Sequence, residues 1–342
     1  MSNSKLKIVH FCNSLHLGGV EIMSTQKLID FKALGHEVTM CTYEDGYASK
    51  YLTDADIHIE YCKNREHAIG FIKEFSADII HGQSCGGGSE GVEVGRQLGI
   101  IHGETIHSMA HGSPLGNFEV VYNDINHRNR PGSTLIYWGF NVDRLKPTLT
   151  REEARERWGI PKDVYLIARN GRLDGSKAPA DFIETLARLP EWVWGLCGGW
   201  GPEGDNLMRQ AHRLNVLKRL KFTGAQYSVG DTFVGADCIV YPTHDESFCA
   251  GVIEPRWQWK PVVCYVRGGM AQHCIHEETC LVGNSPDELA SHVTRLIQDT
   301  QLAADIGRRG YEICEKHGYW DHMRDAKQHI ELYTKVLNER EM

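Results

Sequence analysis

Several features that mark other classes of protein are missing from this sequence of 342 residues. No apolar stretch approaches the roughly 20 residues of a membrane-spanning helix, and the opening MSNSKLKIVHF is a polar lead into a strand, not a signal peptide. Internal repeats are also lacking. Positive charge is in deficit, because 37 Lys and Arg against 45 Asp and Glu give a net charge of −8. We therefore expect a soluble, cytoplasmic protein without an integral membrane segment or a general polyanion-binding surface.

The sequence also lacks the pattern of a disulfide-bonded or zinc-binding protein. Its 11 cysteines are odd in number, and several fall within apparent strands: Cys41, Cys197, Cys238 and Cys264. Such positions are typical of reduced core thiols in a cytosolic protein. A second group follows no common zinc spacing: His273, Cys274, His276 and Cys280. We expect no metal site.

The length and the order of elements predict two α/β domains of ordinary size. The first half opens with a strand at 7–12, a turn containing Gly18 and Gly19, a helix with apolar residues at helical spacing, and a strand at 37–42. In the second half, apolar strands are expected at 164–168, 192–197, 220–224, 238–241 and 262–266. Thr150 and Glu153 predict a capping box at the first helix of this half.

Two carboxylates border one predicted crevice. Glu246 lies on the loop that follows the strand at 238–241, and Glu254 lies about two turns into the next helix. Parallel sheets bind ligands at such strand ends, where loops expose backbone N–H groups and positive helix ends. Carboxylates beside these donors suit a polyhydroxylated ligand that also carries phosphate. The alternative is that Glu246 caps a helix and Glu254 lies at the surface.

Cations and glycines follow two other strands of the second half. Arg172 and Lys177 come after the strand at 164–168, where two cations can hold a diphosphate as its charge grows. The run Gly198-Gly199-Trp200-Gly201-Pro202 ends the next strand. It does not fit a dinucleotide fingerprint, because Pro202 stands where the helix should continue.

Taken together, these motifs resemble family 4 of the retaining glycosyltransferases. The signature Glu, any residue, Phe, five residues, Glu reads E-S-F-C-A-G-V-I-E from Glu246 to Glu254. The motifs that precede it stand in the family's order over nearly the whole chain: the GGVE turn, the interdomain Gly139-Phe140-Asn141-Val142-Asp143, the Gly-Arg-Leu with Lys177, and the Gly-x-Gly-Pro turn. The sequence departs from the family at Gln272, where a Glu is usual.

The resemblance implies an α/β fold of the GT-B architecture, with two Rossmann-like, doubly wound parallel-sheet domains facing a cleft. The implied domains are an acceptor-side domain at 1–145, a nucleotide-sugar-binding domain at 146–318, and a C-terminal helix at 319–342 that returns to the first domain.

The resemblance also implies roles for individual residues. Its catalytic set would be His107, Glu246, Arg172 and Lys177. His107 would lie close to the anomeric carbon, with His111 a weaker candidate. The donor and nucleotide would be bound by Gly18, Gly19, Arg172, Lys177, Gly199, Thr223, Gly224, Glu246, Phe248, Cys249 and Glu254.

The implied function is retaining transfer of a sugar from a nucleotide-diphosphate sugar to a hydroxyl acceptor by a front-face, metal-independent mechanism. No cofactor is required, and a UDP-sugar is favoured over a GDP-sugar. The acceptor is a saccharide, a small molecule or a lipid-linked hydroxyl, so peripheral membrane contact stays open. Three alternatives remain: transfer to a modified base in DNA, which the net charge disfavours; a nucleotide-sugar epimerase of the same fold; and a non-catalytic nucleotide-sugar-binding protein.

Overall fold

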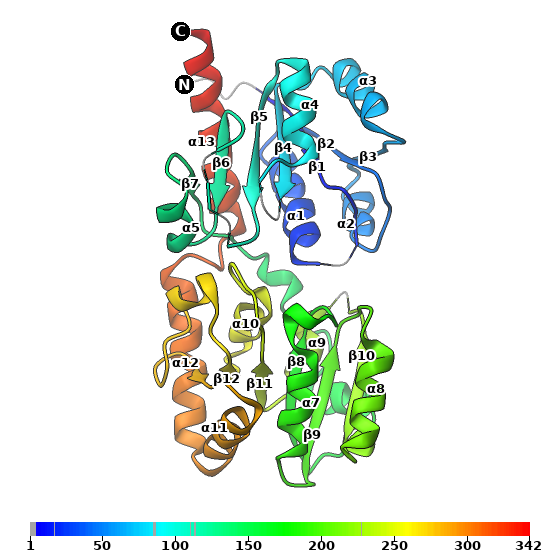
Figure 1. Cartoon of the computed structure of the whole chain (residues 1–342), viewed down its shortest axis with the longest axis vertical. Coiled ribbons are helices and arrows are strands. Elements are labelled where there is room, and N and C mark those ends of the chain that lie inside the picture. Colours follow the sequence, from blue (N-terminus) through cyan, green and yellow to red (C-terminus); the bar gives the residue numbers. More distant parts are fainter. Residues whose placement is uncertain (1–4, 17, 85–86, 110, 113, 227) are drawn as a thin grey trace. The chain divides into compact units, whose positions relative to one another are not determined.

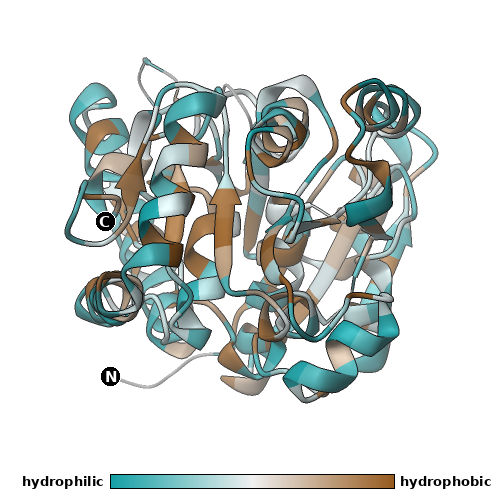
Figure 2. Ribbon diagram, turned by 90° about the horizontal axis from the view of Figure 1, so that it is seen from below, coloured by the Kyte–Doolittle hydropathy of each residue, from teal (hydrophilic) through white to brown (hydrophobic). Residues whose placement is uncertain are grey.

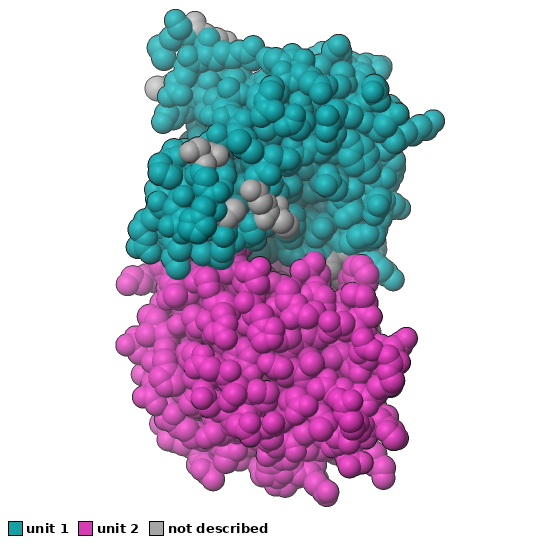
Figure 3. Space-filling view, in the orientation of Figure 1, with its two compact units in different colours: residues 1–140, 321–342 teal, residues 141–320 magenta. Residues whose placement is uncertain are grey.

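The structure is a computed structural model that describes residues 5–16, 18–84, 87–109, 111–112, 114–226 and 228–342. The chain divides into two compact units, Met1–Phe140 with Asp321–Met342, and Asn141–Trp320 (Figure 3). The first boundary therefore falls slightly earlier than the expected end at residue 145. No helix among the described residues is both long and apolar enough to cross a membrane.

The first unit is built on a seven-stranded parallel sheet with the order β3-β2-β1-β4-β5-β6-β7. Its strands are β1 Lys7–Phe11, β2 Glu37–Thr42, β3 His58–Tyr61, β4 Ile79–Ser84, β5 Ile101–Ile106, β6 Phe118–Val121 and β7 Thr134–Leu135. Its helices are α1 Gly19–Ala33, α2 Ser49–Asp54, α3 Arg65–Phe75, α4 Glu90–Leu98, α5 Asp124–Asn129 and α13 His322–Glu341 (Figure 1). The order reverses direction between β1 and β4, which is a topological switch point.

Helix α13 packs against the sheet of the first unit through buried polar groups. The Lys27 ammonium of α1 forms an ion pair with the Asp325 carboxylate, and both side chains are almost completely buried. The second carboxylate oxygen of Asp325 accepts a hydrogen bond from the Gly139 N–H at 3.0 Å. The Tyr333 hydroxyl is hydrogen-bonded to His81 of β4. Residues more than 180 positions apart are thereby joined in one fold.

The second unit is built on a six-stranded parallel sheet with the order β10-β9-β8-β11-β12-β13. Its strands are β8 Tyr165–Asn170, β9 Val193–Gly198, β10 Leu220–Gly224, β11 Cys238–Tyr241, β12 Val262–Cys264 and β13 Leu281–Val282. Its α-helices are α6 Arg151–Arg157, α7 Pro179–Ala187, α8 Gly204–Arg213, α9 Val229–Val234, α10 Ala250–Ile253, α11 Pro286–Gln298 and α12 Thr300–Lys316. Its short 3-10 helices are η1 Val142–Arg144, η2 Gly175–Lys177, η3 Leu217–Arg219, η4 Glu254–Gln258 and η5 Gly268–Gln272.

The central strands are buried on both faces of the sheet, as expected of parallel strands, whereas the edge strand β3 is partly exposed. Every residue of β11 is buried, and so is every residue of β12. Figure 2 shows apolar strands inside and hydrophilic surfaces on the outer helices. The two parallel sheets confirm the predicted doubly wound α/β fold, and the predicted capping box of Thr150 and Glu153 is present at α6.

The helix after β11 is shorter than expected. Helix α10 ends at Ile253, and Glu254 is the first residue of η4 instead of lying two turns into an α-helix. Pro255 accounts for the change, because it has no N–H to donate to the helical carbonyl four residues earlier. The candidate carboxylate of Glu254 therefore lies at a junction between two short helices.

Candidate functional site

The sheet of the second unit reverses its strand order between β8 and β11, and the candidate residues gather at the carboxyl ends of these two strands. Lys177, in η2 after β8, forms an ion pair with Glu246, which follows β11; the Lys177 Nζ to Glu246 Oε1 distance is 2.8 Å. Nζ also donates to the Asp245 carbonyl at 3.0 Å. The two side chains are only 17% and 10% exposed. A cation and an anion predicted separately thus meet at one switch point.

The loop that carries Lys177 is shaped by local capping. Asp174 accepts a hydrogen bond from the Ser176 N–H and so caps η2. The loop is tied to β11 as well, because the Thr243 hydroxyl donates to the Ser176 carbonyl at 3.1 Å and the His244 N–H donates to the same oxygen at 2.9 Å. These bonds fix the distance between the loops that follow the two strands.

Arg172 occupies a different environment from Lys177. Its Nε lies 3.1 Å from the Asp174 carboxylate, and its side chain is 55% exposed. No ion pair between Arg172 and Glu246 is found among the described residues. The two cations come from one loop, but only Lys177 contacts the candidate glutamate.

Glu254 is a half-buried carboxylate without a hydrogen-bond partner among the described residues. Burial raises the pKa of its carboxyl to about 7, and the positive charge of Arg144 partly opposes this shift. A carboxylate that is partly removed from water and has no protein donor is energetically costly unless a ligand supplies one. Hydroxyl groups of a bound ligand are donors of the required kind.

Tyr241 lies near both glutamates. Burial raises the pKa of its hydroxyl, and the charges of Glu246 and Glu254 raise it further. Its ring fits between two glycines: a Cβ on Gly171 would lie 2.5 Å from the Tyr241 hydroxyl, and one on Gly251 would lie 2.4 Å from its Cε2. The ring therefore sets the spacing between the β8 loop and α10.

Phe248 and Cys249 directly precede α10, and Cys249 is the N-cap residue of that helix. The Phe248 ring is buried, with ring centroids 5.7 Å from His273 and 5.0 Å from Tyr319. Cys249 is buried and has a φ of 70°, in the left-handed region that a residue with a Cβ adopts at a cost of about 1 kcal/mol or more. Burial raises the pKa of its thiol well above the ordinary value. A strained, buried residue at a helix start is a feature of sites that position backbone N–H groups for a ligand.

The predicted glycine turn after β9 packs directly on the β8 loop. Gly199 has a φ of +116°, and a Cβ there would lie 1.8 Å from the Gly171 carbonyl oxygen, so only glycine fits. Its N–H donates to the Gly224 carbonyl at 2.9 Å. Thr223 is joined to Gln226, whose amide donates to the Thr223 carbonyl at 2.7 Å. Gly199, Thr223 and Gly224 thus lie together at the carboxyl ends of β9 and β10.

The candidates of the first unit lie at the ends of β1 and β5. Gly18 is the N-cap of α1, and Gly19 is its first residue; a Cβ on Gly19 would meet no described atom within 4 Å. The His107 Nε2 is hydrogen-bonded to the Gln83 side chain at 2.7 Å. Burial lowers the pKa of His107 to about 3, so its imidazole is neutral at neutral pH. Part of the glycine run after β4, Cys85 and Gly86, lies outside the described residues.

Arg169 is a residue that sequence reasoning missed. It lies within β8, is fully buried, and donates to the carbonyl oxygens of Arg172 at 3.4 Å and Lys177 at 3.3 Å. Its guanidinium also lies 5.5 Å from the centroid of the Tyr241 ring. The sequence did contain a signal for Arg169, because it is a permanently charged residue within an otherwise apolar strand. Such a residue requires polar partners when it is buried.

Comparisons with known proteins find similar sequences and similar structures. Residues 150–313 match the family model described as glycosyl transferases group 1. D-inositol 3-phosphate glycosyltransferase 2 of Catenulispora acidiphila is 29% identical over 197 residues, covering 53% of this chain and 46% of that protein. D-inositol 3-phosphate glycosyltransferase of Streptomyces avermitilis is 27% identical over 219 residues, covering 59% of this chain and 47% of that protein. The chain spans about half the length of the curated relatives it matches.

Solved structures resemble the chain over nearly its whole length. The structure of HepE from Anabaena in complex with UDP and glucose gives a TM-score of 0.85 at 17% identity, covering 96% of this chain and 99% of that one. Sucrose-phosphate synthase of Thermosynechococcus elongatus gives a TM-score of 0.78 at 19% identity, covering 98% of this chain and 100% of that one. These likenesses, with the two parallel sheets, define a protein of the GT-B fold, as the motifs predicted. The similarity to the glycosyl transferases group 1 family lies in residues 150–313, within the second unit.

Proposed function

We propose that the chain is a retaining glycosyltransferase that moves a sugar from a nucleotide-diphosphate donor to a hydroxyl group. The observation that carries the proposal is the pairing of Lys177 with Glu246 at the β8 and β11 switch point. The nearby Glu254 carboxylate, which lacks a donor among the described residues, supports it. This arrangement supplies a cation for phosphate and two carboxylates for hydroxyl groups.

Each residue of the second unit has a proposed role. Glu254 accepts hydrogen bonds from the ribose hydroxyls, and Glu246 accepts one from a hydroxyl of the donor sugar. Backbone groups of Phe248 and Cys249 help to hold that sugar. Arg172 and Lys177 bind the diphosphate, which gains negative charge as the bond to the anomeric carbon breaks. Gly199, Thr223 and Gly224 border the nucleotide.

In the first unit, we propose that the Gly19 amide assists the diphosphate, that Gly18 lets the backbone approach it, and that His107 lies near the anomeric carbon. The neutral state of His107 suits a hydrogen-bonding role beside the sugar and not a role as a cation. The acceptor oxygen attacks on the face that the diphosphate leaves, which retains the anomeric configuration and requires no enzymic nucleophile. In this proposal Arg172 and Lys177 supply the positive charge that a metal ion supplies elsewhere, so no metal takes part in transfer.

We propose UDP as the nucleotide, because the similar HepE structure is a complex with UDP and glucose. The acceptor is proposed to be a hydroxyl of a polyol or saccharide, in line with the inositol phosphate named for the curated relatives. All ten cysteines that the structure describes are buried free thiols, which fits action in a reducing compartment such as the cytoplasm.

A donor-binding screen followed by a transfer assay tests the proposal. Thermal shift with UDP, GDP and their sugars identifies the nucleotide, and calorimetry with Glu254→Gln measures the loss of affinity. The matched control is Glu191→Gln, because Glu191 is exposed at the opposite end of β9. We expect Glu254→Gln to bind UDP at least tenfold more weakly, and Glu191→Gln to bind as the unaltered chain does.

The reaction is then followed by NMR with the tightest-binding donor and a set of polyol and saccharide acceptors. Transfer with an unchanged anomeric configuration supports the proposal. An inverted product contradicts retention, and a free epimerised sugar indicates an epimerase. Donor binding without any turnover indicates a binding protein. Full activity in both Glu254→Ala and Arg172→Ala, with folding verified by circular dichroism, overturns the site.

A further inference from the structure

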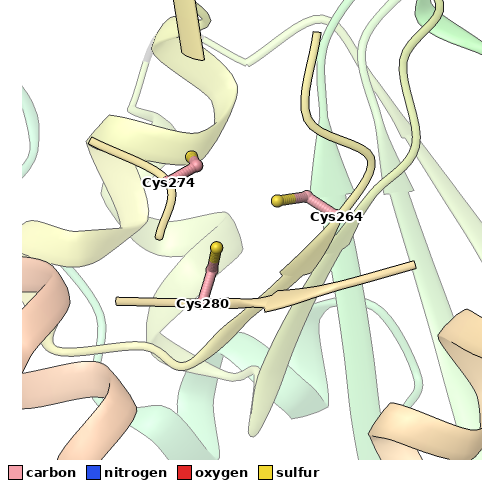
Figure 4. Close-up of side chains that lie close together, drawn as sticks. All are labelled: Cys264, Cys274 and Cys280. Carbon is pink, nitrogen blue, oxygen red and sulfur yellow. The ribbon is translucent and has the colours of Figure 1, made fainter. Parts of the chain in front are cut away.

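Three cysteines of the second unit gather in its interior. Cys264 ends β12, Cys274 follows η5, and Cys280 precedes β13; their sulfur atoms lie within 4.8 Å of one another. Figure 4 shows the three thiols, which come from separate segments, clustered around a shared space. All three side chains are buried. Each cysteine offers a soft sulfur ligand, and no other group of three or more such ligands is found in the described ranges.

The loop from 273 to 280 is held in the shape that brings two of these thiols together. The Thr279 hydroxyl donates to the His273 carbonyl at 2.8 Å and accepts from the Ile275 N–H at 2.9 Å. A bridge between His276 and Cys280 closes the loop. These bonds within the loop hold Cys274 and Cys280 close to each other, and the pairing of β12 with β13 places Cys264 beside them.

A buried guanidinium lies beside this cluster. Arg256 is fully buried and donates to the carbonyl oxygens of His273 and Thr279 at 3.0 and 3.1 Å. Its other contacts are sulfur atoms, Cys274 at 3.6 Å and Cys314 at 3.8 Å. No carboxylate contacts Arg256 in the part of the chain that the structure describes. A buried cation without a counterion is strongly unfavourable, so the thiol cluster is the available source of negative charge.

We infer that Cys264, Cys274 and Cys280 bind one zinc ion. Zinc binds thiolates, and three thiolates with one Zn²⁺ carry a single negative charge. The Arg256 guanidinium balances that charge, which leaves the buried site neutral. Copper(I) also binds thiolates, but its lower charge leaves an uncompensated negative charge in the interior.

His273 supplies the fourth ligand in this proposal, because zinc in structural sites has four. It precedes Cys274, is fully buried, and its Nε2 has no hydrogen-bond partner among the described residues. Its ring nitrogens lie outside the set formed by the three sulfurs, so binding requires a turn of the side chain.

Metal analysis of the full chain tests the inference. The protein is purified under reducing conditions without chelator, incubated with ZnCl₂, desalted, and measured by mass spectrometry for zinc and copper. We expect one zinc per chain, which a mercurial reagent releases to a chromogenic chelator, and thiolate-to-cobalt charge-transfer absorption after replacement with Co²⁺. Removal of zinc by a chelator should lower Tm by several degrees, and ZnCl₂ should restore it.

The variants Cys264→Ser and Cys280→Ser should each lose zinc, and His273→Ala should bind it at least tenfold more weakly. Cys314→Ser is the control, because Cys314 is a buried thiol that contacts Arg256 but lies outside the cluster. Absence of zinc in the unaltered chain, with three reactive thiols or a disulfide in its place, overturns the inference. Stoichiometric copper in place of zinc, or equal zinc in the control and cluster variants, also overturns it. Unchanged affinity in His273→Ala removes His273 from the site. The mercurial measurement needs no variant, so a failure of the serine variants to fold leaves the test intact.

Discussion

The Glu254 carboxyl has a pKa near 7 and no hydrogen-bond donor among the described residues, so proton binding should compete with ligand binding. In the free protein the carboxyl is protonated below pH 7 and ionised above it. If ribose hydroxyls donate to the carboxylate, affinity for UDP should rise about tenfold between pH 6 and pH 8. Calorimetry across this range provides the measurement.

Glu254→Gln separates this effect from other titrations. It should remove the rise in affinity with pH. It should also stabilise the protein at pH 8, because the native pKa lies above the value of 4.5 for an ordinary glutamate, so the carboxylate lowers stability as pH rises from about 4.5 to 7. The gain is on the order of 1–3 kcal/mol by urea unfolding. A pH profile of binding that is identical in the variant would show that another group titrates.

Lys177 is the cation that the structure places against Glu246, so its removal should act on both catalysis and folding. In Lys177→Ala, the proposed diphosphate leaving group loses the ammonium group that stabilises it, and the rate of transfer should fall by about 10²–10³. The free energy of unfolding should fall by about 1–3 kcal/mol, because the Glu246 carboxylate remains mostly shielded from water and loses its ion pair. Steady-state kinetics and urea unfolding measure the two effects.

The double variant Lys177→Met with Glu246→Gln distinguishes these contributions. It should recover much of the stability and none of the activity, since both buried charges are gone. Lys218→Ala in η3 serves as a control on a surface turn. If the double variant transfers sugar at the rate of the unaltered chain, the ion pair is not required for transfer.

At the scale of elements, Arg169 joins β8 to the loop that holds the cations. Arg169→Met keeps a side chain of similar length but loses the hydrogen bonds to the carbonyl oxygens of Arg172 and Lys177. We expect weaker UDP binding and a larger spread of conformations in residues 172–177, seen as faster hydrogen exchange there. Arg155→Met, which alters a buried arginine elsewhere in the same unit, controls for general destabilisation. Equal exchange rates in both variants would contradict a positioning role for Arg169.

Local signals in the sequence were sufficient to predict the elements. Buried strands such as β11 and β12 appear as short apolar runs, and the capping box at α6 depends only on Thr150 and Glu153. The early end of α10 could also have been read from Pro255, whose missing N–H stops the helix.

The sequence predicts candidate site residues one by one but does not predict the contacts among them. Glu246 and Lys177 were both expected near the donor, but the sequence does not reveal that they bind each other, or that Arg172 binds Asp174. The same limit applies to the cysteines. Cys264 joins Cys274 and Cys280 only because β12 and β13 are paired in the sheet, and linear spacing carries no trace of that pairing.

At the scale of the whole molecule, the ion pair of Lys27 and Asp325 joins α1 to α13 in the interior of the first unit. Lys27→Met leaves the Asp325 carboxylate buried without its cation, so the free energy of unfolding of this unit should fall by about 3–5 kcal/mol. Urea unfolding and limited proteolysis of α13 measure the loss. Lys335→Met, on the exposed side of α13, is the matched control and should have little effect.

The double variant Lys27→Met with Asp325→Leu should restore much of the stability, because it removes both charges. A single variant Lys27→Met that unfolds at the same urea concentration as Lys335→Met would show that the buried pair does not hold α13 in place.

The membership of α13 in the first unit has a consequence for biosynthesis. A ribosome releases Asn141–Trp320 before α13, so the second unit can finish folding while the sheet of the first still lacks its last helix. Until α13 docks, Lys27 lacks the Asp325 carboxylate as its counterion, and the apolar surface that α13 covers is exposed to water. Nascent chains stalled just before His322 should therefore recruit chaperones that the finished polypeptide no longer needs.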